Sequence, residues 1–124
     1  MKKILIVDDE AGFTRLMKLT LEKTGEYEVV EENNGACAYP TAKRERPDLI
    51  LMDIVMPKVD GGDAAAQIRR DPALAAIPIV FLTAIVSRKE AAPGGLIGGF
   101  PFLSKPVSLA TLRASIEEHL PVSH

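Results

Sequence analysis

Polar residues able to hold a cation follow short apolar runs of this sequence. Asp8 and Asp9 close the first run, Asp53 closes the third, and Thr83 and Lys105 close two later runs. Three carboxylates that are brought together repel one another, and their pKa values rise unless a cation neutralises them. Hard oxygen ligands with no His or Cys nearby favour Mg²⁺ over zinc. The residue types therefore indicate a Mg²⁺ site if the fold brings them together.

Such a site suits phosphoryl transfer. A carboxylate can attack a phosphoryl group and form an acyl phosphate. The transferred group carries charge on three oxygens, which a metal ion, an ammonium and a hydroxyl can stabilise. Taken singly, each residue has a plainer explanation, because an acid after a strand often caps the next helix, as Asp9 or Glu10 could do here. The combination at four strand ends is what indicates chemistry.

The apolar runs are predicted strands, and helical patterns separate them. Continuous β-branched runs are typical of parallel strands that are buried on both faces. The predicted strands cover residues 4–7, 27–30, 49–52, 79–82 and 100–103, and the predicted helices cover 11–24, 35–46, a segment after Gly61-Gly62, and 108–120. This alternation predicts an α/β fold with a doubly wound, five-stranded parallel sheet and helices on both faces. Ligands bind at the carboxyl ends of the strands in such sheets, so the polar residues should converge there.

Local signals refine the helices. Asn34 and Ser108 are candidate N-caps, and Pro40 predicts a kink or a late start in the second helix. A fourth helix is expected at residues 86–97, but Pro93 and several glycines make it short or irregular. The predicted inward-facing residues are Phe13, Leu16, Met17, Thr20 and Leu21 in the first helix, and Leu109, Leu112, Ile116 and Leu120 in the last.

Length and composition bound the function. The 124 residues fit a single domain, 1–124, and the net charge of −2 lacks the basic excess of a general nucleic-acid binder. One cysteine, Cys37, excludes an internal disulfide and favours a reducing compartment. The first apolar run is too short for an export signal, and no run approaches the roughly 20 apolar residues of a membrane span. We expect a cytoplasmic protein with no membrane insertion.

The sequence resembles the chemotaxis-regulator-like receiver domains of two-component response regulators. The matching segments are ILIVDD at 4–9, PDLILMDIVMP at 47–57, DG at 60–61, IVFLTA at 79–84 and FLSKP at 102–106. The resemblance covers essentially the whole chain at the family's spacings. It implies a flavodoxin-like fold of receiver type and a phosphoacceptor switch rather than an enzyme.

The resemblance also implies the metal site and its reaction. Asp53 would accept a phosphoryl group from a phosphohistidine on a histidine kinase or phosphotransfer protein. Mg²⁺ would be held by Asp8, Asp9, Asp53 and the carbonyl of Val55, with Asp9 as a direct ligand and Asp8 acting largely through water. Lys105 would pair with a phosphoryl oxygen.

The switch implied by the resemblance uses two residues. Thr83 would close on a phosphoryl oxygen, and Phe102 would fill the space that Thr83 vacates. This shift of a pre-existing equilibrium would change a partner-binding face. The implied partner is a downstream protein effector, without direct nucleic-acid binding, and a phosphorylation-dependent dimer is compatible with it.

Val55 and Ile85 are apolar at positions that flank the phosphoryl site in the family. A polar residue there can position the hydrolytic water. We therefore predict slow self-dephosphorylation.

Two other functions compete. A haloacid-dehalogenase-like aspartyl-phosphate phosphatase would need an acid two residues after the nucleophile, where this chain has Val55. A flavodoxin-like redox module would need a phosphate loop after the first strand, where Asp8, Asp9 and Glu10 would repel a flavin phosphate. The sequence favours the phosphoacceptor switch over both.

Overall fold

Five parallel strands form the centre of the molecule. The computed structural model describes residues 1–57, 59–83, 96–97, 100–105 and 107–120. The strands lie in the order β2-β1-β3-β6-β8, and all four neighbouring pairs are parallel. Their bounds are Lys2–Val7 for β1, Tyr27–Glu32 for β2, Leu49–Asp53 for β3, Ile79–Thr83 for β6 and Phe100–Ser104 for β8. The predicted five-stranded parallel sheet is confirmed.

Three short strands were not predicted. β7 (Leu96–Ile97) pairs antiparallel with β8 at the edge of the sheet, and β4 (Val55–Met56) pairs with β5 (Val59–Asp60) in a separate ribbon. Most of the expected helix at 86–97 lies outside the described residues. Its last two residues form β7, so the helix is wrong there: their backbone pairs with β8, which would otherwise expose an open edge.

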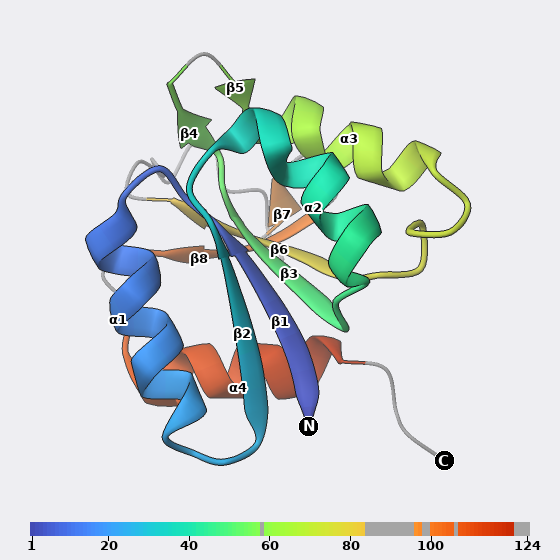
Figure 1. Cartoon of the computed structure of the whole chain (residues 1–124). Coiled ribbons are helices and arrows are strands. Elements are labelled where there is room, and N and C mark those ends of the chain that lie inside the picture. The colour runs from blue at the N-terminus through green and yellow to red at the C-terminus, as the bar shows by residue number, and fades with distance from the viewer. Residues whose placement is uncertain (58, 84–95, 98–99, 106, 121–124) are drawn as a thin grey trace.

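The helices cover both faces of the sheet. α2 (Ala38–Glu45) and α3 (Gly61–Arg70) pack on one face, while α1 (Ala11–Glu22) and α4 (Leu109–His119) pack on the other (Figure 1). The doubly wound arrangement is thus as predicted. In the described part of the chain, every helix is too short or too polar to cross a membrane.

The predicted helix starts are present. Asn34 accepts a hydrogen bond from the Ala36 amide at 3.0 Å and begins the 3₁₀ turn η1 (Gly35–Cys37). α2 follows this turn, so Pro40 lies in its first helical turn, where its missing amide hydrogen costs nothing. Ser108 caps α4 by accepting from the Thr111 amide at 3.1 Å.

The apolar residues of the central strands are directed alternately to two cores. In β3, Leu49 and Leu51 pack with α1 and α4, while Ile50 and Met52 pack with α2 and α3. All four are fully buried. Strand side chains alternate between the two faces of the sheet. Because helices cover both faces, every position along this strand needs an apolar residue.

The inward stripe of α1 differs from the prediction most clearly at Leu16. Met17 and Leu21 are buried, but Leu16 is 58% exposed. Thr14 occupies the buried position one turn before Met17, and its hydroxyl donates a hydrogen bond to the Glu31 carboxylate at 3.0 Å. Because α1 is rotated so that Thr14 faces the sheet, Leu16 faces solvent. Leu109 of α4 was likewise expected inside and is 38% exposed, because it follows directly on the Ser108 cap.

Leu21 and Leu16 offer a matched pair on one helix. Leu21→Ala should lower the free energy of unfolding by about 2–5 kcal/mol, because it leaves a cavity in the core. Leu16→Ala should change it by no more than about 0.5 kcal/mol. Urea unfolding followed by circular dichroism measures both, and equal losses would contradict this placement of α1.

Candidate functional site

Asp53 is the last residue of β3 and is 5% exposed. Its Oδ1 accepts a hydrogen bond from the Val55 amide at 3.2 Å. Burial, followed by the negative charge of Asp8, raises the pKa of Asp53, and the Lys105 ammonium offsets only part of this rise. Asp53 is therefore an acid held at the sheet edge in surroundings that disfavour its charge.

The chain behind Asp53 is held by a close approach of α3. The Gly61 amide donates to the Ile54 carbonyl at 2.9 Å. A Cβ on Gly61 would lie 2.7 Å from the Ile54 Cα and would also collide with the Asp53 carbonyl. Only glycine lets α3 begin this close to the acid.

Asp8 lies at the end of β1 and is completely buried. Its amide donates to the Glu32 carbonyl at 3.0 Å, and its own carbonyl accepts from the Asn33 side chain at 2.8 Å. Its carboxylate accepts from the Glu10 amide at 2.9 Å. The end of β2 thus fixes the backbone of Asp8, while its carboxylate faces the sheet edge.

Lys105 reaches this edge from the residue after β8. Its side chain is 10% exposed, and its Nζ lies 2.5 Å from Asp8, 3.5 Å from Asp53 and 3.6 Å from Glu10. Burial by itself would lower the pKa of Lys105, but the hydrogen bond and charge of Asp8, with Asp53 and Glu10, leave it raised. The ammonium is therefore a fixed positive charge between carboxylates.

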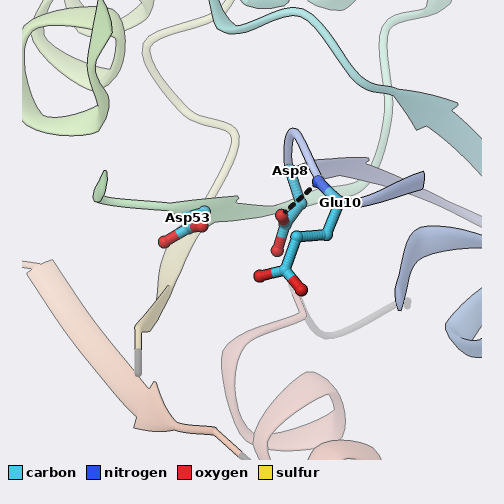
Figure 2. A group of neighbouring side chains, drawn as sticks. All are labelled: Asp8, Glu10 and Asp53. Carbon is cyan, nitrogen blue, oxygen red and sulfur yellow. Dashed lines mark hydrogen bonds between the residues drawn. The ribbon is translucent and has the colours of Figure 1, made fainter. Parts of the chain in front are cut away.

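Three acids gather around this ammonium. Carboxylate oxygens of Asp8, Glu10 and Asp53 all lie within 4.8 Å of one another (Figure 2). Asp9 is exposed and lies outside this group as the structure describes it.

Sequence reasoning missed Glu10 because it read the residue as a possible helix cap. Glu10 does occupy the N-cap position of α1, but its side chain makes no capping hydrogen bond. Its carboxylate instead approaches Lys105. The available signal was a third consecutive acid at a strand end.

These residues fit a small divalent cation. Their described ligands are carboxylate oxygens, the donors that Mg²⁺ prefers, and oxygens bound to one Mg²⁺ lie about 3–4 Å apart. The oxygens of Asp8, Glu10 and Asp53 all lie within 4.8 Å of one another, close to that range. Asp8, Glu10 and Asp53 would hold the ion, and the exposed Asp9 lies next to them in the chain.

The remaining predicted residues lie near the same edge. Val55 begins β4 and is 56% exposed. Thr83 ends β6, whose partner β3 ends at Asp53. Phe102 is half-buried in β8 opposite Phe81 and packs against the core that α2 and α3 cover. Ile85 lies outside the described residues.

Comparison with known proteins agrees with this arrangement. A family model described as the response regulator receiver domain matches residues 4–117. The chain belongs to this family. It is therefore a receiver domain of two-component signal transduction, and the match supports this prediction rather than the phosphatase alternative.

Individual relatives show the same domain in proteins of different lengths. PilH of Pseudomonas aeruginosa is 39% identical over 118 residues, which cover 94% of this chain and 95% of PilH. PhoP of Bacillus subtilis, named a transcriptional regulatory protein, is 34% identical, but the match covers only 47% of it. The chain thus spans about half the length of several curated relatives.

A solved structure reproduces the fold. The chemotaxis response regulator CheY4 of Vibrio cholerae superposes with a TM-score of 0.84 at 30% identity, covering 97% of this chain and 99% of CheY4.

Asp53 should make stability depend on pH. Because its pKa is raised in the folded state, ionisation destabilises the fold as pH rises above the unfolded value of about 3.9. Asp53→Asn, which stays neutral, should therefore be more stable than the wild type at pH 7, and the gain should vanish below about pH 4. Thermal unfolding across this range measures it.

Asp63→Asn is the control for this measurement. Asp63 is an exposed acid in the first turn of α3 and should give no such gain. Equal stability of Asp53→Asn and the wild type at pH 7 would contradict the described environment of Asp53.

Proposed function

We propose that residues 1–124 form one receiver domain that accepts a phosphoryl group on Asp53 in a Mg²⁺-dependent reaction. The observation that carries the proposal is the buried Asp53 carboxylate, with the Lys105 ammonium 3.5 Å away and Asp8 beside it. A nucleophile, a fixed cation and a set of oxygen ligands thus meet at one sheet edge. This is the combination that transfer to a carboxylate requires.

In the proposed step, an Asp53 oxygen attacks the phosphorus of a phosphohistidine. The O–P bond forms as the P–N bond breaks, and the imidazole leaves and takes a proton from solvent. A bound Mg²⁺ would neutralise charge on the phosphoryl oxygens. Lys105 stabilises a further oxygen, and the Val55 amide holds the carboxylate in place.

The response to phosphorylation is proposed to run through Thr83 and Phe102. Thr83 ends the strand next to Asp53, and Phe102 lies one strand further on. A phosphoryl oxygen gives the Thr83 hydroxyl a new partner, and its movement lets Phe102 shift inward. The change alters the face near β8, which a downstream protein effector or a second copy of the chain could bind.

The proposed phosphodonor is a histidine kinase or a phosphotransfer protein, acting in the cytoplasm. The single cysteine, Cys37, also favours that compartment. We propose output through protein contact without direct nucleic-acid binding, since the net charge is −2. The domain is proposed to act as a switch and not as a turnover enzyme.

The phosphoacceptor can be tested with acetyl phosphate. Incubation with acetyl phosphate and Mg²⁺ should add one phosphoryl group, detected by mass spectrometry of the intact protein. The adduct should be absent in Asp53→Asn and after chelation of the metal. Asp63→Asn is the matched control and should label like the wild type.

Two results would contradict the proposal. One is an adduct that persists in Asp53→Asn, which would place the phosphoryl group elsewhere. The other is turnover of the donor with no adduct, which would indicate a phosphatase.

Val55 should set the lifetime of the phosphorylated form. Its side chain is apolar and exposed two residues after Asp53, so it offers no hydrogen bond to an attacking water. Val55→Asn should shorten the half-life by about tenfold by orienting that water, whereas Val55→Leu should leave it unchanged. Decay of the adduct after donor removal measures both, and an unchanged half-life in Val55→Asn would refute the explanation.

A further inference from the structure

An aromatic ring covers the ammonium of Lys105. The Nζ lies 4.3 Å from the centroid of the Phe13 ring. Phe13 is in the first turn of α1, directly after the acid-bearing loop, and it packs against the core between α1, α4 and the sheet. The ring is therefore held by the core while its face meets the charge.

Phe13 differs in kind from the other partners of this ammonium. The remaining described contacts are Asp8, Glu10 and Asp53, and each of these is a carboxylate that a divalent cation would also attract. The Phe13 ring cannot ligate Mg²⁺. It is the one described partner that remains available to Lys105 when a cation takes the carboxylates.

We propose that Phe13 is a positioning residue that keeps the Lys105 ammonium at the phosphoryl site when the cation is bound. The inference rests on the proposed function of Asp53. A lysine side chain has four flexible bonds and loses rotamer freedom when it is held in one place. A cation–π contact stabilises a desolvated ammonium without competing for metal ligands, and Lys105 is only 10% exposed.

Substitutions at Phe13 separate the ring's charge contact from its packing. Phe13→Leu keeps an apolar side chain but removes the aromatic face. Phe13→Tyr and Phe13→Trp keep it. Met17→Ala damages the same core one turn further along α1, while the aromatic ring over Lys105 is kept.

The first measurement is the rate of Asp53 phosphorylation by acetyl phosphate at saturating Mg²⁺. Phe13→Leu should slow it by about threefold to thirtyfold, the range expected for a lost cation–π contact. Phe13→Tyr or Phe13→Trp should retain a rate near that of the wild type, and Met17→Ala should lower stability more than rate.

The second measurement is independent of phosphorylation. The Lys105 Nζ lies 4.3 Å from the ring centroid, so the ε-methylene protons on the neighbouring carbon should give NMR signals shifted upfield in the wild type and in Phe13→Tyr. Addition of Mg²⁺ should preserve this shift, and Phe13→Leu should abolish it. Loss of the shift on adding Mg²⁺ to the wild type would overturn the inference.

The outcomes distinguish the two proposals. If the wild type forms an adduct and Phe13→Leu forms it equally fast, the inference fails and the proposed function stands. If Phe13→Leu and Met17→Ala slow phosphorylation equally and the Tyr variant does not restore the rate, the role of Phe13 is packing alone and the inference also fails. If the wild type forms no adduct, the proposed function is overturned, and the proposed role of Phe13 falls with it.

Discussion

The ammonium of Lys105 contacts the carboxylate of Asp8, although the two residues are 97 positions apart in the sequence, and Asp53 and Glu10 lie close by. Without that ammonium, the two buried acids at this edge, Asp8 and Asp53, would face each other with little solvent to screen their repulsion. The site therefore depends on the register that places the end of β8 beside β6, and β6 beside β3.

The surrounding fold fixes the backbone at this edge. Hydrogen bonds from β2 fix the backbone at Asp8, and Gly61 lets α3 press against the chain after Asp53. The apolar residues of β1, β3 and β6 are buried on both faces of the sheet, so these strands cannot slide without exposing apolar residues to water. Because the strand ends are held in this way, the ammonium of Lys105 and the carboxylates of Asp8 and Asp53 keep fixed distances from one another.

The elements that the sequence predicted well are those governed by local rules. Short apolar segments identified the five parallel strands, although the segment at 27–30 is interrupted by Glu28, and Asn34 and Ser108 marked helix starts through their own side chains. Leu16 was misplaced because its orientation depends on Thr14, whose hydroxyl is satisfied by Glu31 from another element. β7 was missed because a two-residue strand exists only by pairing with its neighbour.

By itself, the sequence determined the parallel sheet and the convergence of Asp8, Asp53, Thr83 and Lys105 on its carboxyl edge, since strand direction alone dictates which ends meet. Only the tertiary structure decided which groups surround the ammonium. It turned Glu10 toward Lys105 instead of into a helix cap, left Asp9 in solvent, and set the Phe13 ring against the charge. These side-chain directions follow from how α1 packs on the sheet, and packing is a property of contacts between distant segments.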